Sequence, residues 1–192
     1  MFCLEGEWSP DLRKRTSVEP VLQLLERLGL ITTIHRDVAT ASELEFYLKK
    51  WLQHRYENYA VLYLACHGTA KGIDLGGSTV TLADLGDILA DGCRGSTIYF
   101  GSCMGMGSED RVLMDFVAKT RAKAVVGYSK NIEWLDSAAF ECLLLDRLVR
   151  GNRTDGMFNQ LHNDHGQMAQ RLGLVAATRS TVYRAPRRTR TE

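Results

Sequence analysis

Three short and almost continuously apolar segments constrain the fold of this chain more than any other feature. They are residues 59–65 (YAVLYLA), 96–100 (STIYF) and 124–128 (AVVGY). Each is shorter than a typical buried helix, and none alternates between apolar and polar residues as a half-exposed strand does. All three therefore predict strands that are covered on both faces, which is typical of parallel sheets.

The segments around these strands carry apolar residues at helical spacing. Helices are predicted from Ser17 and Ser42, each with its serine as the N-cap, and from Ser137, capped by Asp136 or Ser137. A glycine pair, Gly76-Gly77, predicts a hairpin. Strands that alternate with helices predict an α/β fold, with a mostly parallel sheet and helices on both faces. The remaining predicted elements are strands at 2–4, 30–38 and 174–183 and helices at 82–89, 111–120 and 155–172.

The length of 192 residues predicts one domain, over residues 1–183, followed by a basic and flexible tail at 184–192. The formal net charge of +1 gives no reason to expect direct nucleic-acid binding or an anionic membrane as a partner. No apolar run reaches the length of a membrane span, and the N-terminus does not resemble a secretory signal. Five cysteines without a CxxC pair argue against disulfides or a zinc ribbon. These features predict a cytoplasmic protein.

A histidine and a cysteine follow two of the predicted buried strands. In parallel sheets, functional residues gather where the carboxyl ends of the strands meet. The strand at 59–65 leads into His67-Gly68, and the strand at 96–100 leads into Cys103. An imidazole can generate a thiolate and later protonate a leaving amine. We therefore predict His67 and Cys103 as catalytic residues, with the backbone amides of Gly68 and Cys103 as an oxyanion hole.

The order of these motifs resembles the CHAT group of caspase-like cysteine peptidases. The resemblance lies in YLACHGT (63–69), the hairpin and helix GIDLGGSTVTLADLGDIL (72–89) and TIYFGSCMG (97–105), and it extends over AVVGYSKNIEWLDSAAF (124–140). It implies a caspase-like three-layer sandwich and a cysteine endopeptidase with Cys103 as nucleophile and His67 as general acid and base. It also implies a protein substrate, control by a regulatory protein partner or a ligand, and a role in bacterial antiviral defence or a programmed response.

Two departures from the family pattern bear on specificity. The caspase signature around the nucleophile is absent, so strict specificity for aspartate is not supported. Gly101 occupies the position two before Cys103, where arginine-specific metacaspases carry an acid. Relatives also carry serine or threonine where this chain has Cys66, next to His67.

The loop after the third buried strand is the predicted substrate-binding segment. Trp134 would form an aromatic wall, and Glu133 or Asp136 would select a basic side chain. A plain helix-capping role for Asp136 is the alternative interpretation. Tyr128 and Ser129, at the end of that strand, complete the predicted substrate-binding set.

Other classes of function and site find less support. The main alternative is a catalytically inactive caspase-like module used for protein assembly. A nucleotide-binding domain would need a GxGxxG or phosphate-loop motif, and the sequence has neither. His162 and His165 lie on one predicted helix without further ligands, so no metal or cofactor is predicted. The other thiols are predicted as core residues (Cys3, Cys66 and Cys142) or as a loop thiol (Cys93).

Overall fold

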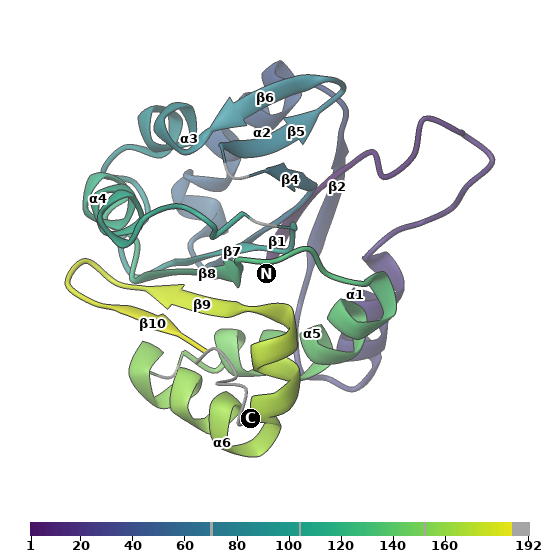
Figure 1. Ribbon diagram of the computed structural model, residues 1–192. Helices are drawn as coiled ribbons and strands as arrows, with labels where there is room; N and C mark the ends of the chain where they lie inside the picture. Colours follow the sequence, from purple (N-terminus) through teal and green to yellow (C-terminus); the bar gives the residue numbers. More distant parts are fainter. Residues whose placement is uncertain (70, 104, 152, 186–192) are drawn as a thin grey trace.

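A seven-stranded sheet forms the centre of the protein, in the strand order β10-β9-β8-β7-β3-β1-β2 (Figure 1). The computed structural model describes residues 1–192 apart from residues 70, 104, 152 and 186–192. Strands β1, β2, β3, β7 and β8 run parallel, whereas β9 is antiparallel to β8 and β10 is antiparallel to β9. The strands are β1 (Phe2–Gly6), β2 (Ile34–Val38), β3 (Val61–Ala65), β7 (Thr97–Phe100), β8 (Ala124–Tyr128), β9 (Leu174–Ala177) and β10 (Val182–Arg184).

Helices cover both faces of this sheet, which confirms the predicted α/β fold with three layers. On one face α2, α3 and α4 pack against one apolar cluster, and on the other α1, α5 and α6 pack against a second (Figure 1). Every residue of β3, β7 and β8 is buried, because side chains alternate between the two covered faces. The helices are α1 (Glu19–Arg27), α2 (Ala41–Trp51), α3 (Leu82–Leu89), α4 (Asp110–Thr120), α5 (Trp134–Val149) and α6 (Thr154–Leu172), with a short 3-10 helix, η1 (His54–Tyr56).

A second, three-stranded antiparallel sheet follows β3 directly. Its strands are β4 (His67–Thr69), β5 (Gly72–Leu75) and β6 (Ser78–Thr81), in the order β4-β5-β6. Gly76 and Gly77 connect β5 to β6 with φ angles of +58° and +82°, in the region that glycine adopts at little cost. The predicted hairpin is therefore confirmed, and its first strand, β5, pairs with the strand β4 that begins at His67.

Three predicted helix caps are wrong. Thr40 caps α2 instead of Ser42, because Thr40 and Glu43 form a reciprocal capping box. Helix α5 begins at Trp134 with Glu133 as its N-cap, so Ser137 lies within the first turns and its hydroxyl donates to the Trp134 carbonyl. Ser17 lies one residue before the N-cap of α1, which is Val18.

The C-terminal strand also differs from its prediction. The segment at 174–183 is a hairpin of two strands, β9 and β10, and not one edge strand. Arg184, assigned to the flexible tail, belongs to β10 and makes an ion pair with Asp110 at 2.7 Å. The other arginines of the predicted tail, at 187, 188 and 190, lie outside the described residues.

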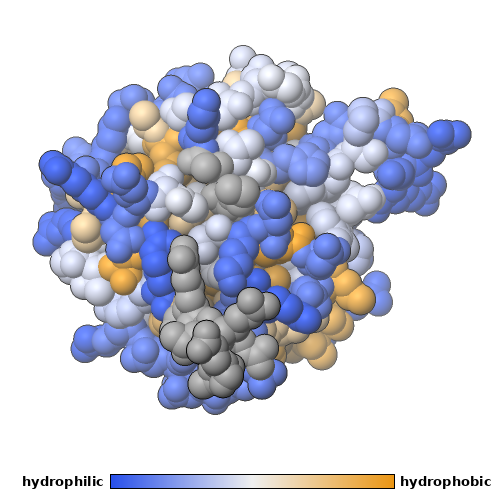
Figure 2. All heavy atoms as spheres, in the orientation of Figure 1, coloured by the Kyte–Doolittle hydropathy of each residue, from blue (hydrophilic) through white to orange (hydrophobic). Residues whose placement is uncertain are grey.

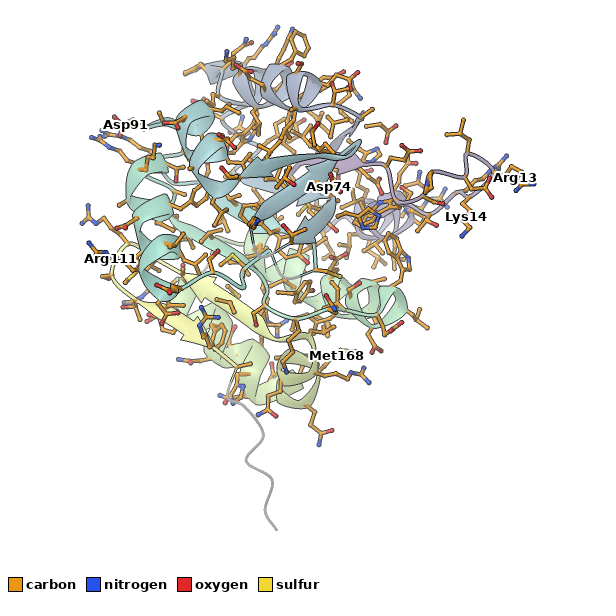
Figure 3. The ribbon with its side chains drawn as sticks, turned by 45° about the horizontal axis from the view of Figure 1, so that its top comes forward. Arg13, Lys14, Asp74, Asp91, Arg111 and Met168 are labelled. Carbon is orange, nitrogen blue, oxygen red and sulfur yellow. The ribbon has the colours of Figure 1, made fainter. Side chains whose placement is uncertain are left out.

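Charged and polar side chains dominate the face shown in Figure 2, with small apolar areas between them. A loop between β1 and α1 projects from the body of the protein, and Arg13 and Lys14 lie near its tip (Figures 1 and 3). Trp8 and Ser17 lie in the same connection, and both side chains donate hydrogen bonds to Glu5 of β1. Within the described residues, no helix combines the length and the apolar character that crossing a membrane requires.

The capping box of α2 gives the first testable prediction. Replacing Thr40 by alanine removes the side-chain acceptor of the Glu43 amide, so we expect the free energy of unfolding to fall by about 1 kcal/mol. Ser42→Ala is the matched control, because Ser42 lies inside the helix and should change stability by less than about half of that amount. Urea unfolding of both variants is the measurement. Equal losses in the two variants would contradict the assignment.

Candidate active site

Strands β3 and β7 bring His67 and Cys103 to the same edge of the central sheet. The two strands are adjacent and parallel, and their last paired residues are Leu64 and Phe100. His67 and Cys103 each lie three residues beyond this last pair. The Gly101 amide donates to the Leu64 carbonyl at 3.0 Å and extends the pairing by one step. The sheet register therefore places the two residues at equivalent positions.

The backbone after His67 lies against the backbone before Cys103. A Cβ atom on Gly68 would lie 2.4 Å from the Cys103 carbonyl oxygen and 2.7 Å from the Ser102 side chain. No larger residue fits at position 68 unless one of these segments moves. Gly68 is therefore required for the close approach of the histidine segment to the cysteine segment.

His67 and Cys103 both line a cavity of about 160 Å³. Trp8 and Val18, from the connection between β1 and α1, contribute one part of its wall. The remaining lining comes from Val21 of α1, from Gly101 after β7, from Ile132 and Trp134, and from Ser17, Ser137, Ala138 and Glu141. The cavity thus joins the predicted dyad to residues from four separate parts of the chain.

Trp8 contacts the exposed imidazole of His67 through its backbone carbonyl and through its ring. The His67 Nε2 atom lies 3.1 Å from the Trp8 carbonyl oxygen, and the two rings meet edge to face at 5.2 Å. A carbonyl oxygen can only accept, so Nε2 carries the hydrogen and Nδ1 is left without a proton in the neutral ring. That tautomer is able to take a proton from a thiol. The rings of Trp134 and Trp8 also meet edge to face, with their centroids 4.8 Å apart.

The Cys103 sulfur contacts the backbone of Ile132. The Ile132 amide donates to Sγ at 3.4 Å, and the Ile132 carbonyl oxygen lies 3.8 Å from Sγ. The backbone of Ile132 therefore fixes the position of the sulfur. Cys103 and Cys142 are half-buried, while Cys3, Cys66 and Cys93 are buried. The core prediction is thus confirmed for Cys3 and Cys66, whereas Cys142 is partly accessible. Cys93 lies in a loop, as predicted, and is buried there.

A buried carboxylate, Glu5 at the end of β1, fixes the position of Trp8. Its oxygens accept from Trp8 Nε1, from the Ser17 hydroxyl at 2.8 Å and from the Val18 amide at 2.8 Å, and they lie 2.6 Å from His35 Nε2. Burial alone would raise the pKa of Glu5, but these hydrogen bonds outweigh it and lower the pKa. The hydrogen bond to Glu5 in turn raises the pKa of His35.

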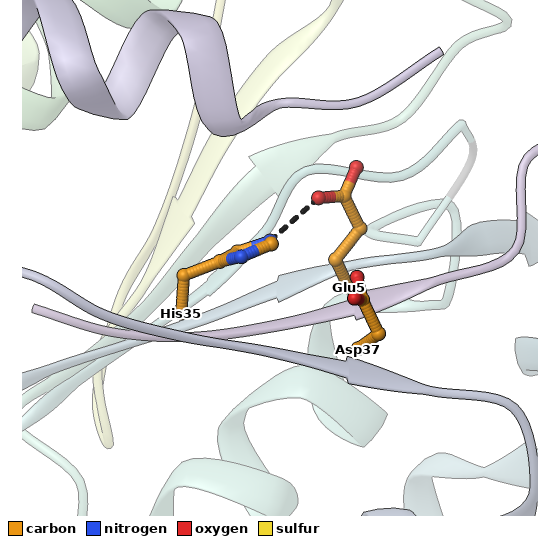
Figure 4. A group of neighbouring side chains, drawn as sticks. All are labelled: Glu5, His35 and Asp37. Carbon is orange, nitrogen blue, oxygen red and sulfur yellow. Dashed lines mark hydrogen bonds and ion pairs between the residues drawn. The ribbon is translucent and has the colours of Figure 1, made fainter. Parts of the chain in front are cut away.

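Glu5, His35 and Asp37 form a group whose ligand atoms lie within 4.8 Å of one another (Figure 4). Both oxygens of Glu5 already have two partners each, and Asp37 is exposed. A carboxylate with all its lone pairs engaged fits a structural role better than a metal centre. We therefore interpret the group as an ion pair that anchors the loop carrying Trp8.

A second buried carboxylate, Glu141 of α5, lines the cavity itself. Its Oε1 atom accepts from the Tyr99 hydroxyl at 2.7 Å, and that hydroxyl also lies 3.1 Å from the Tyr128 hydroxyl. Burial raises the pKa of Glu141 to about 7, although the hydroxyls of Tyr99 and Tyr63 oppose the shift. This side chain therefore keeps its proton to a higher pH than an exposed glutamate does.

The predicted substrate-binding residues do not all lie at the cavity. Trp134 lines the cavity, while Glu133, at the N-cap of α5, is exposed and does not. Asp136 also lies outside the lining and makes an ion pair with Arg171 at 2.7 Å. Tyr128 is fully buried, and the Ser129 hydroxyl donates to the Gly173 carbonyl. Of this set, the structure brings only Trp134 to the dyad.

A family described as "Family of unknown function (DUF6642)" matches residues 1–175 of the chain. The chain belongs to this family. Among proteins of curated function, none matches the sequence. The match extends over both candidate catalytic residues of this DUF6642 chain and over all of the residues that line its cavity. The description of the family assigns it no activity, so the site itself must carry the functional argument.

Sequence reasoning missed Trp8 and Glu141. The signal for Glu141 was present, because the buried positions of α5 follow a helical stripe of Ser137, Phe140, Glu141, Leu144, Leu145 and Leu148. An acid on an otherwise apolar stripe indicates a buried carboxylate. Trp8 had no comparable signal, because it lies in an irregular loop whose path depends on Glu5.

The raised pKa of Glu141 predicts a pH-dependent stability. An unfolded glutamate titrates near 4.5, so the native state holds this proton up to about pH 7 while the unfolded state has lost it. Stability from this group is therefore present below about pH 4.5 and is lost as the pH rises to about 7. Between pH 5 and pH 8 the loss amounts to about 2–3 kcal/mol.

Glu141→Gln keeps the size of the side chain and cannot titrate, so it should abolish this loss. Urea unfolding of wild type and variant at pH 5 and pH 8 is the measurement, and we expect the variant to gain about 2–3 kcal/mol relative to wild type over that interval. Parallel changes in both proteins would show that Glu141 titrates as it does in the unfolded chain.

Proposed function

We propose that this protein is a cysteine endopeptidase of the caspase-like CHAT type, with Cys103 as nucleophile and His67 as general acid and base. One observation carries the proposal: both residues follow adjacent parallel strands at the same register position and line one cavity. Only glycine at position 68 permits the two backbone segments to approach each other so closely, and this also supports the proposal. The α/β sandwich and the β5–β6 hairpin also agree with the resemblance seen in the sequence.

The geometry assigns a separate task to each residue. With Nε2–H on the Trp8 carbonyl, Nδ1 of His67 takes the proton of the Cys103 thiol, and the thiolate attacks the carbonyl carbon of the scissile peptide bond. The imidazolium then gives its proton to the leaving amine, and a thioester remains on Cys103. Water activated by His67 attacks the thioester, releases the carboxylic acid product and restores the thiol.

The oxyanion formed in both steps needs donors that are already in place. We assign this role to the backbone amides of Gly68 and Cys103, on the two segments that approach each other at position 68. A donor of this kind typically contributes about 10²–10³ in kcat. The described residues show no hydrogen bond between the His67 and Cys103 side chains, and catalytic contacts of this kind often tighten only when substrate binds.

The protein substrate, the regulatory partner and a role in antiviral defence within the cytoplasm follow from the resemblance alone. They are part of the proposal. A partner that binds the projecting loop near Arg13 would act on the site through Trp8, since both lie in the connection between β1 and α1.

A panel of fluorogenic peptides tests the activity. We expect cleavage by the wild type and a fall of at least about 10³ in kcat/KM for Cys103→Ala and for His67→Ala. Because the two residues act as a unit, the double variant should be no slower than either single one. Cys142→Ala is the control, since it removes the other half-buried thiol and should keep full activity. Equal activity of Cys103→Ala and wild type would refute the dyad, and the absence of any turnover would favour the inactive assembly module.

Alkylation by iodoacetamide tests the nucleophile without a substrate. Cys103 should react faster than Cys142, because the proposed dyad provides the His67 imidazole as a base for this thiol, whereas burial raises the pKa of Cys142. Mass spectrometry of the digested protein gives both rates. His67→Ala should slow the labelling of Cys103 only. If both thiols react equally fast in the wild type, His67 does not activate Cys103.

A further inference from the structure

The cavity beside Cys103 has the size of one amino-acid side chain. Its volume of about 160 Å³ lies below the range of roughly 300–1,000 Å³ that is usual for whole small-molecule ligands. Val18, Val21, Ile132 and Trp134 supply apolar surface, and Glu141 supplies a carboxylate. A side chain that fills this space therefore meets an apolar wall and a single buried acid.

Glu141 lacks a cation among the described residues. The Tyr99 hydroxyl donates to its Oε1 atom at 2.7 Å, and the Tyr63 hydroxyl also faces this carboxylate. No lysine, arginine or histidine of the described chain forms an ion pair with it. A buried carboxylate is costly unless a positive charge or several donors compensate it. Glu5, which is buried to the same extent, has four partners.

The groups around this carboxylate are neutral. The hydroxyl of Tyr63 is fully buried and faces Glu141, and its pKa is raised by burial and by the nearby carboxylate. It lies beside Gly101, which lines the cavity, and a Cβ atom at position 101 would come within 2.3 Å of the Tyr63 ring. Neutral hydroxyls compensate a buried negative charge less completely than a cation does, so the carboxylate keeps capacity for a basic ligand.

The side chains that satisfy all of these features are long and basic. Arginine and lysine have an aliphatic stem that packs on apolar surface and a cationic head that donates hydrogen bonds. The indole rings of Trp8 and Trp134 add surfaces that favour a nearby cation. An acidic side chain would be repelled by Glu141, and an apolar one would leave its charge without compensation.

We propose that this cavity binds the side chain of an arginine or lysine residue, with the cationic head on Glu141. The inference deepens the proposed function and rests on it in one respect. If Cys103 cleaves a peptide bond, the residue bound in the cavity is the one that precedes this bond. Specificity for a basic residue then comes from Glu141, inside the cavity, and not from Glu133 or Asp136 on its outside.

Peptide substrates that differ in one charge test the specificity. Arginine and citrulline have the same shape, but citrulline is neutral, so we expect the wild type to cleave after arginine about ten- to hundredfold more efficiently. Glu141→Gln should bring the two values of kcat/KM together by slowing cleavage after arginine alone. Glu45→Gln, an exposed glutamate of α2 that pairs with Lys49, is the matched control and should keep the wild-type ratio.

Ligand binding tests the cavity without catalysis. We use Cys103→Ala and titrate it with n-butylguanidine, a cation, or with n-butylurea, its neutral counterpart, following the fluorescence of the tryptophans that line the cavity. We expect saturable binding of n-butylguanidine, at least about tenfold weaker binding of n-butylurea, and loss of this difference when Glu141→Gln is added.

The two experiments separate the two claims. Selective binding of n-butylguanidine without any peptide cleavage would retain the basic subsite and refute the peptidase. Peptide cleavage with equal efficiency after arginine and citrulline would retain the peptidase and overturn the subsite. Equal binding of both small ligands, no binding of either, or a change of specificity in Glu133→Gln but not in Glu141→Gln would also overturn the role assigned to Glu141.

Discussion

The carboxylate of Glu5 organises the part of the molecule on which the site depends. It is only 3% exposed, and its four partners come from β2, from the loop after β1 and from the start of α1. One of these partners is the indole of Trp8, whose carbonyl oxygen holds His67 and whose ring contacts Trp134. The orientation of the imidazole therefore depends on a buried ion pair at the edge of the sheet. Loss of that ion pair would free the loop after β1, and Trp8 and His67 would lose their fixed orientations with it.

The pKa values of the two buried carboxylates, Glu5 and Glu141, are shifted in opposite directions. Glu5 is saturated with donors, so its pKa is lowered and its charge is stable in the native state. Glu141 has only the neutral hydroxyls of Tyr99 and Tyr63 beside it, so burial dominates and raises its pKa to about 7. The first arrangement is that of a structural anchor, whereas the second leaves binding capacity for a ligand. The contrast separates residues that build the site from residues available to a substrate.

The sequence predicted the parts of the site that local patterns determine. Buried parallel strands give continuous apolar runs, so the ends of β3 and β7, with His67 and Cys103 beyond them, were identified before the structure. Patterns could not place Trp8, because the loop that carries it is fixed by long-range hydrogen bonds to Glu5. The cap of α2 failed because the pattern is ambiguous: Thr40 with Glu43 and Ser42 with Glu45 both have the spacing of a capping box, and the structure uses the first pair. Glu141 was visible on the apolar stripe of α5, but its partner Tyr99 lies 42 residues away.

The central claim is that Cys103 forms a covalent bond to its substrate with the help of His67. Intact-protein mass spectrometry after acid quenching of a reaction with a peptide ester tests it most directly, because esters acylate thiols faster than amides do. The account predicts an added mass equal to the acyl group, located on the peptide that contains Cys103 and absent in Cys103→Ala and His67→Ala. An adduct on Cys142, or turnover of the ester that persists in Cys103→Ala, would contradict it.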